Sequence, residues 1–320
     1  MGKDARLALK PRGPIVVIVN PRAGQGRTAR RWAALRPHLE SVLGAVQIRE
    51  TRAPQHATAL TRSAIRAGSK TVIAVGGDGT ANEVVNGFFD GEVAIAADTV
   101  LGLIPQGTAS DFRRALSIPL DEKAALEIIC KARVKRIDVE RVSFQTVEGT
   151  RAQRYGVNIT SFGMGGAVAA RTNRSSKILG GKLSFLLATA ITTIQFRGHT
   201  VTLGLEGQAP REMNISNVAV GNGQFHGGGM WMCPRAAVDD GLLDVTVIRY
   251  LSAGEILRSL SFLYNGKVYE HPKVEFHRVA RLRATAKEPS WIEIDGEPAG
   301  RLPVEISVLP RAIGVYAPEE

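Results

Sequence analysis

The densest chemical signal in the sequence is Gly76–Thr80, in which three glycines and an aspartate occupy four successive positions. The apolar run Val72–Val75 precedes it, and Val84, Val85 and Phe88 follow at a spacing that suits one face of a helix. A glycine turn between a strand and a helix aims unpaired backbone N–H groups at an anion. Glycine also permits positive φ and a close approach of the backbone to a phosphate. The stretch is therefore predicted to bind phosphate.

Asp78 is the unusual member of this turn. Its carboxylate would repel a phosphate unless a divalent cation lay between the two groups, so its presence indicates a nucleotide bound with Mg²⁺. The alternative is an ordinary strand-to-helix turn in which Asp78 caps the helix.

Two further turns follow strands in the first part of the chain. Asn20–Gly26 comes after the strand Pro14–Val19, and Pro105–Phe112 comes after the strand Val100–Ile104. Helices are expected between the strands, and this alternation predicts a doubly wound, mostly parallel α/β layer. Ligands of such sheets bind beyond the carboxyl ends of the strands. The three turns are therefore expected to meet at one edge.

The pattern changes after residue 136. Short segments with strand-like composition follow, and they favour a mainly antiparallel, β-rich second domain with inserted helices. The predicted division is a nucleotide-binding domain of residues 14–136, joined by the returning segment from about 306 to 320, and a substrate domain of residues 137–305. The expected strands of the second domain are Ile137–Phe144, Arg154–Ile159, Thr200–Leu205, Asn214–Val220, Val245–Arg249, Trp291–Ile294 and Val304–Leu309.

Two acidic turns in the second domain could do chemistry. Asp239–Asp244 crowds carboxylates around a glycine, which suits a hard cation such as Mg²⁺, although an Asx-type turn explains much of the same pattern. Asp295 and Glu297 follow the strand Trp291–Ile294 and could take a proton from a hydroxyl. The alternative for this second pair is an ordinary hairpin turn.

One helical stripe and the overall charge bear on the partners. Gly181–Ile194 places apolar residues on one helical face, which predicts either core packing or a surface fitted to an acyl chain, as a cavity wall or a membrane-facing helix. The net charge of +11 favours anionic partners such as nucleotides and acidic lipids. Aromatic residues do not accompany the basic ones, so no nucleic-acid partner is expected. A signal peptide and a membrane span are not expected, which predicts a cytoplasmic protein that touches a membrane peripherally.

Together these motifs resemble the catalytic domain of the diacylglycerol kinase family, which includes sphingosine kinases and soluble bacterial lipid kinases. The resemblance covers most of the chain. It implies an NAD-kinase-like α/β domain, a β-sandwich-like domain, and catalysis in the cleft between them. It rests on Asn20–Gly24, Gly76–Glu83, Pro105–Thr108, Asp240–Asp244 and Asp295–Glu297.

The resemblance also implies roles for individual residues. ATP would be the co-substrate, and Asp78 would organise Mg²⁺ and the triphosphate. Either Glu297 or Asp295 would be the base that accepts the lipid hydroxyl proton. A structural Mg²⁺ would bind the Asp240 side chain and the carbonyls of Ala237 and Leu242. The implied ATP-binding residues are Asn20, Pro21, Arg22, Ala23, Gly24, Thr51, Gly76, Gly77, Asp78, Gly79, Thr80, Ala81, Asn82 and Thr108.

Two departures from the family pattern qualify the resemblance. Ser110 stands where the family commonly has Asn, and Arg22-Ala23 stands where a hydroxyl residue often precedes the glycine. The expected function is phosphorylation of a lipid hydroxyl, of diacylglycerol or a related lipid. The alternatives are an NAD kinase and a catalytically weak lipid- or nucleotide-binding regulator. The acceptor lipid and the oligomeric state, including a homodimer, are left open.

Overall fold

The protein is described from a computed structural model that covers residues 11, 13–107, 109–174 and 189–319. The chain divides into two compact units. The first comprises Met1–Ile137 and Arg311–Glu320, and the second comprises Asp138–Pro310. The strands β7 (Val134–Gln145) and β18 (Glu297–Tyr316) each contribute residues to both units.

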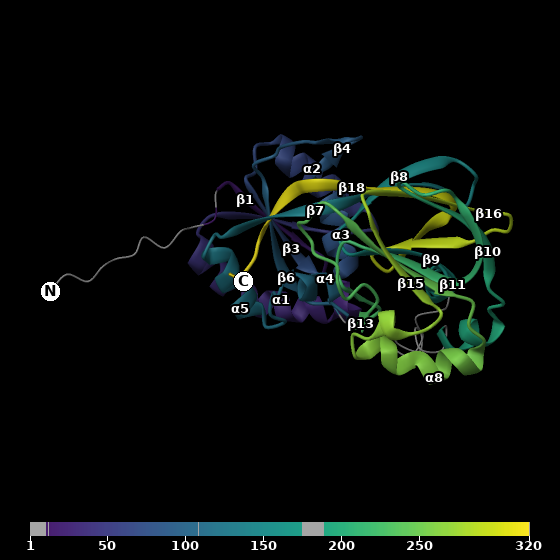
Figure 1. Cartoon of the computed structure of the whole chain (residues 1–320). Coiled ribbons are helices and arrows are strands. Elements are labelled where there is room, and N and C mark those ends of the chain that lie inside the picture. Colours follow the sequence, from purple (N-terminus) through teal and green to yellow (C-terminus); the bar gives the residue numbers. More distant parts are fainter. Residues whose placement is uncertain (1–10, 12, 108, 175–188, 320) are drawn as a thin grey trace. The chain divides into compact units, whose positions relative to one another are not determined.

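The first unit is built on neighbouring parallel strands (Figure 1). The order is β2-β1-β3-β6, and the last residues of β18 pair with β6 so that Gly314 lies opposite Val100. All of these pairs are parallel. The bounds are β1 Ile15–Val19, β2 Val46–Glu50, β3 Thr71–Gly76 and β6 Val100–Pro105, with the short hairpin strands β4 Phe89–Asp90 and β5 Val93–Ala94.

Helices cover the central strands of the first unit on two sides. The strands β1, β3 and β6 are buried along their whole length, which is why their sequences are continuous apolar runs. The helices α2 and α3 pack together against them, and so do α1 and α5 (Figure 1). The helix bounds are α1 Arg27–Leu43, α2 His56–Arg66, α3 Asp78–Asn86, α4 Asp111–Ala115 and α5 Glu122–Cys130, with the 3₁₀ turn η1 Ala23–Gly26.

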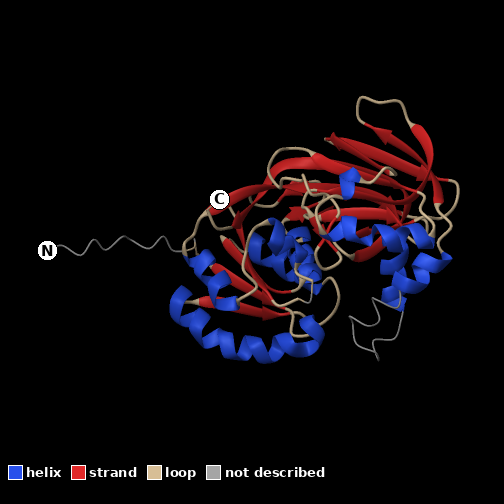
Figure 2. Ribbon diagram, turned by 60° about the horizontal axis from the view of Figure 1, so that its bottom comes forward, coloured by secondary structure: helices blue, strands red, loops and turns tan. Residues whose placement is uncertain are grey.

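The second unit is rich in strands (Figure 2). Strand β11 pairs in antiparallel fashion with β10, β14 and β9. The bounds are β8 Arg151–Gly156, β9 Ile159–Gly163, β10 His199–Leu205, β11 Arg211–Gly221, β12 Phe225–His226, β13 Met230–Trp231, β14 Leu243–Arg249, β15 Val274–Val279, β16 Arg281–Ala286 and β17 Trp291–Ile294.

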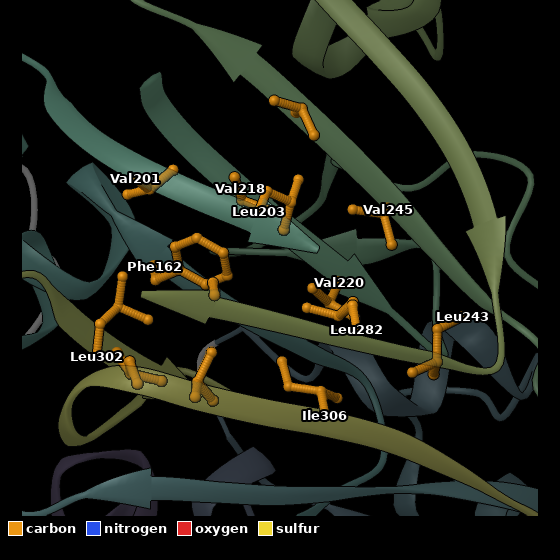
Figure 3. Close-up of a cluster of buried hydrophobic side chains, with 14 of the residues drawn as sticks. Phe162, Val201, Leu203, Val218, Val220, Leu243, Val245, Leu282, Leu302 and Ile306 are labelled. Atoms are coloured by element: carbon orange, nitrogen blue, oxygen red, sulfur yellow. The ribbon is translucent and has the colours of Figure 1, made fainter. Parts of the chain in front are cut away.

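The core of the second unit is formed by alternate residues of these strands (Figure 3). Phe162, Val218, Leu282 and Ile306 come from four different strands and are almost completely buried. Alternation arises because successive side chains of a strand point to opposite faces. The packing therefore fixes the register of β9 and β17, the strands that carry the acidic site described below.

Helices are few in the described part of the second unit. They include α6 (Met164–Arg174), α8 (Ala253–Tyr264) and the 3₁₀ turn η3 (Val268–Glu270). A capping box formed by Ser252 and Glu255 starts α8. The predicted apolar stripe Gly181–Ile194 lies largely outside the described residues; residues 189–195 are helical.

Candidate active site

The Gly76–Thr80 motif forms the predicted strand–turn–helix. The strand β3 ends at Gly76, Gly77 is the residue that caps the helix, and α3 begins at Asp78. The first amides of α3 therefore have no partners within the helix and face the turn. The alternative, in which Asp78 itself is the cap, is not what the structure shows.

The turns that follow β1, β3 and β6 meet at one edge of the first unit. The side-chain amide of Asn20 donates to Thr80 Oγ1 at 2.9 Å, which joins the first turn to α3. The backbone N–H of Gln106 donates to Gly76 O at 2.7 Å, which joins the third turn to the second. A Cβ on Gly24 would lie only 2.7 Å from Gln106 O. The prediction that the three turns converge is confirmed.

The reason for glycine at these turns differs from the expected one. Gly76, Gly77 and Gly79 do not have positive φ. Space is the constraint instead, because a Cβ on Gly76 would lie 2.5 Å from Thr80 Oγ1 and a Cβ on Gly107 would lie 2.6 Å from Gly77 Cα. The two turns touch backbone to backbone. Positive φ was the wrong explanation here, although it holds for Gly24 in the first turn.

Asp78 is half-buried at the start of α3. Its Oδ1 accepts a hydrogen bond of 3.2 Å from the backbone N–H of Phe112, so the carboxylate ties α3 to α4. A pocket at this position is lined by Gly76, Gly77, Asp78, Ser110, Phe112 and Arg113 among others. The positive charge of Arg113 interacts with the negative charge of Asp78. A carboxylate, the N–H groups at the start of α3 and a guanidinium around one pocket are suited to an anion bound with a cation.

The other implied ATP-binding residues fall into two groups. Thr80, Ala81, Asn82 and Thr51 are buried, and Asn82 accepts from the side chain of Asn86, so these side chains support the turns. Asn20, Pro21, Arg22, Ala23 and Gly24 are half-buried or exposed in the first turn. Thr108 lies outside the described residues.

Ser110 adopts a left-handed conformation, with φ 52° and ψ 48°, just before α4. Its hydroxyl is buried and has no hydrogen-bond partner among the described residues. Asn tolerates this backbone region better than Ser does, which gives a physical reason for the asparagine that the family commonly has here.

Replacing Ser110 by Asn is therefore expected to raise the free energy of unfolding by about 0.5–1 kcal/mol. Thermal unfolding measures this gain. Ser117→Asn is the matched control, because Ser117 also has positive φ (55°) but is not among the pocket residues named above. Both variants should gain stability, whereas only Ser110→Asn should change ATP affinity. A loss of stability at both positions would contradict the backbone argument.

The second acidic turn holds Asp240 in an ion pair. Asp240 Oδ1 accepts from the backbone N–H of Leu242 at 3.0 Å, and its Oδ2 contacts the guanidinium of Arg278. Arg278 also donates a hydrogen bond of 3.1 Å to Asp244. Burial raises the pKa of Asp244 to about 6 although Arg278 lowers it. The carboxylate and main-chain carbonyls of this turn are oxygen donors that suit a hard cation, with Arg278 as its competitor.

No group of three or more His, Cys, Asp or Glu side chains able to hold a metal occurs in the described part of the chain. A cation at Asp78 or at Asp240 would therefore depend on phosphate, carbonyl or water oxygens for its remaining ligands. This is the usual manner in which Mg²⁺ binds beside nucleotides.

The Asp295–Glu297 segment forms a two-residue hairpin turn. Ile294 pairs with Glu297, and Asp295 and Gly296 have φ of 50° and 84°, the values of a type I′ turn. The hairpin alternative was therefore correct about the backbone. It does not explain the side chain of Asp295, which points back into the unit.

The carboxylate of Asp295 accepts three backbone hydrogen bonds. Val157 N–H donates to Oδ2 at 3.0 Å, and the N–H groups of Asn158 and Ile159 donate to Oδ1 at 2.9 and 3.1 Å. Asp295 is 8% exposed. A carboxylate held by three amides stabilises a loop in its charged form and is a poor proton acceptor.

Three residues beside this turn were not predicted. Glu140 and Glu293 are fully buried, and His226 Nε2 lies 2.8 Å from Glu293 Oε1. Burial, and next the charge of Asp295, raise the pKa of Glu140 well above its usual range. The signal for Glu293 was visible as a charged residue inside the apolar strand Trp291–Ile294. His226 offered none beyond its place before three glycines.

Two family models match most of the chain. Residues 14–142 match the family model described as the diacylglycerol kinase catalytic domain. Residues 158–317 match the model described as the YegS C-terminal NAD kinase beta sandwich-like domain. The two models together span both units.

Curated relatives share about a third of their residues with the chain. A "Probable lipid kinase YegS-like" from Xanthomonas oryzae pv. oryzae is 32% identical over 263 residues, covering 80% of this chain and 82% of the relative. A protein of the same description from Stenotrophomonas maltophilia is 33% identical over 279 residues, covering 85% and 87%. One from Serratia proteamaculans is 30% identical over 317 residues, covering 97% and 96%.

Solved structures share the fold at lower sequence identity. A "putative diacylglycerol kinase from Bacillus anthracis str. Sterne" has a TM-score of 0.77 at 24% identity, with 99% of this chain and 98% of that chain covered. Yeast NADH kinase, solved with NADH, has a TM-score of 0.50 at 10% identity, with 96% and 83% covered. The two-domain fold with a strand-rich C-terminal part is thus common to both kinds of kinase.

Proposed function

Because this chain belongs to the YegS-like lipid kinases of the diacylglycerol kinase family, we propose that it transfers the γ-phosphate of ATP to the hydroxyl of diacylglycerol or a related lipid. The observation that supports this most is the convergence of the three turns around Asp78 in the first unit. Phosphoryl transfer consists mainly of positioning and charge neutralisation, and this edge supplies amides, a carboxylate and a guanidinium.

We propose that ATP binds at this edge against Asn20–Gly24, Thr51, Gly76–Asn82 and Thr108. Mg²⁺ bound there would neutralise phosphate charge, and Asp78 would hold it. Arg113, which also lines the pocket, would add a positive charge beside the phosphates.

Glu297 is the residue that we propose as the base. Asp295 has its carboxylate oxygens engaged by three backbone amides, so its part is to hold the turn. Glu297 is the first residue of β18 and is exposed, and a general base must lie within hydrogen-bonding distance of the hydroxyl that it deprotonates. In this scheme Glu297 takes the hydroxyl proton while the oxygen attacks the γ-phosphorus, and the bond from that phosphorus to the β,γ-bridging oxygen breaks to release ADP.

A kinase assay with radiolabelled ATP tests this function directly. The acceptors are a panel containing diacylglycerol, phosphatidylglycerol, sphingoid bases and ceramide-like lipids, with NAD in a separate reaction. Label is expected in one or more lipids. Label only in NADP would replace the proposal with NAD kinase activity, which the fold shared with yeast NADH kinase makes the proper comparison.

The structural cation is a separate part of the proposal. We propose that Asp240 binds Mg²⁺ together with the carbonyls of Ala237 and Leu242. Adding Mg²⁺ after chelation should then raise the melting temperature, because a ligand at about 100 times its Kd stabilises the folded state by about 2.7 kcal/mol. Asp240→Asn should abolish this rise. Equal melting temperatures of the wild-type chain with EDTA and with Mg²⁺ would exclude the site.

Membrane contact is also proposed, since the substrate is a lipid and the net charge is +11. No helix among the described residues is long and apolar enough to cross a membrane. Co-sedimentation with vesicles should increase with the fraction of phosphatidylglycerol and fall as salt shortens the screening length, which is about 10 Å at 0.1 M. Binding that is insensitive to both would contradict electrostatic attraction.

A further inference from the structure

Glu293 is a fully buried carboxylate in the second unit that the proposed reaction does not yet use. Its Oε2 accepts a hydrogen bond of 2.6 Å from the backbone N–H of Gly296, the middle residue of the turn that carries Glu297. Its Oε1 accepts one of 2.7 Å from Ser161 Oγ on β9. Glu293 thus connects the body of the sheet to the tip of the hairpin.

The surroundings of Glu293 are acidic. Glu140 on β7 and Asp295 in the turn lie in the same buried cluster, and the charges of Asp295 and Glu293 both contribute to the raised pKa of Glu140. Burying a further carboxylate among these groups is strongly unfavourable unless a donor or a cation compensates it. The Gly296 amide and the Ser161 hydroxyl supply two donors. His226 adds a third contact, with its Nε2 2.8 Å from Glu293 Oε1 and its side chain 16% exposed.

Glu293 and His226 come from elements that are distant in sequence. His226 belongs to β12, which pairs with the two residues of β13 and precedes the three glycines Gly227–Gly229, all with positive φ. A short strand beside such a turn does not require histidine for its own stability. The imidazole instead meets a carboxylate that holds the Asp295–Glu297 turn.

We propose that Glu293 and His226 form a positioning pair for Glu297. Glu293 fixes the Gly296 amide, and this sets the direction in which the next residue leaves the turn. His226 Nε2 lies 2.8 Å from Oε1, so a positive charge on the ring stabilises the buried carboxylate in place. The inference rests on the proposed role of Glu297 as the base. The position of the Glu297 carboxylate matters because a displacement of about 1 Å can reduce a reaction rate by about 100-fold.

A double-mutant cycle tests the pair. Glu293→Gln keeps the shape and an oxygen acceptor but removes the charge, and His226→Gln removes the ring. Each variant is expected to lower kcat about tenfold at a nearly unchanged KM for ATP, by analogy with other outer-shell partners of functional residues. Because the two act as a unit, the double variant should be no slower than the slower single variant.

Matched controls exclude general effects of charge or sequence. Glu288→Gln removes an exposed carboxylate in the turn before β17, and His38→Gln removes an exposed histidine of α1. Both controls should keep wild-type kcat. Wild-type kcat in Glu293→Gln, or effects of the two single changes that multiply in the double variant, would overturn the pairing.

A spectroscopic readout separates this inference from the proposed reaction. The amide proton of Gly296 should resonate downfield in the wild-type chain, because it donates to a carboxylate, and should move upfield in Glu293→Gln. An unchanged Gly296 amide shift would overturn the inference whether or not the protein is active. If the Gly296 amide shifts as expected but the wild-type chain transfers no phosphate, the proposed function is overturned and the Glu293 contact is still established.

Discussion

Glu297→Gln is expected to reduce the rate of phosphoryl transfer by about two to four orders of magnitude, the range contributed by a positioned general base. The amide cannot accept the hydroxyl proton, whereas its size matches that of the carboxylate. The free energy of unfolding should therefore change little. Steady-state turnover with labelled ATP and thermal unfolding of the same preparations measure the two quantities.

Asp295→Asn is the control that distinguishes the two carboxylates. This change removes the charge that accepts hydrogen bonds from Val157, Asn158 and Ile159, so it should reduce the free energy of unfolding by about 2–4 kcal/mol. Any reduction in the turnover of Asp295→Asn should result from this loss of stability and not from the loss of a proton acceptor. An inactive but fully stable Asp295→Asn protein, beside an active Glu297→Gln protein, would reverse the proposed roles.

Asp78→Ala is expected to weaken the binding of Mg²⁺-ATP at least about tenfold and to lower kcat about 100-fold, because a cation clamp on the phosphates is lost. The change also removes the acceptor of the Phe112 N–H and so should destabilise the fold by about 1 kcal/mol. Isothermal titration calorimetry with Mg²⁺-ATP measures the first effect.

Asp78→Asn separates the two roles of this side chain. Asparagine keeps an oxygen that can accept from Phe112 N–H but loses the negative charge. If Asp78 acts on the cation, the Asn variant should bind Mg²⁺-ATP as poorly as the Ala variant. Wild-type affinity in Asp78→Asn would show that the residue serves only to connect α3 with α4.

The edge of the first unit where the three turns meet could be predicted because its signals are local in sequence. Each turn follows a continuous apolar strand, and parallel strands carry such turns to one edge. Gly76 and Gly107 were also visible as glycines, but the reason for them was not. The contact between Gly107 and Gly77 joins residues that are distant in sequence, and only the structure shows that a Cβ would have no room there.

The acidic site of the second unit was predicted only in part. Asp295 and Glu297 stand out as carboxylates at a strand end. The neighbouring Glu293 contacts Ser161 of β9 and His226 of β12, and Glu140 of β7 lies in the same cluster. No pattern within one segment indicates that these residues meet. Antiparallel strands that pair across more than 100 residues, as β9 and β17 do, are set by packing of the whole sheet. The contacts of Glu293 therefore appeared only in three dimensions.

We propose that this chain moves the γ-phosphate of ATP onto a lipid hydroxyl with Glu297 as the base. The most direct test measures ADP and phosphorylated lipid in the same reaction with a lipid acceptor. One ADP is expected for each phosphorylated lipid, with both products lost together in Glu297→Gln. ADP formed without any phosphorylated lipid, or formation of both at the wild-type rate in Glu297→Gln, would contradict the claim.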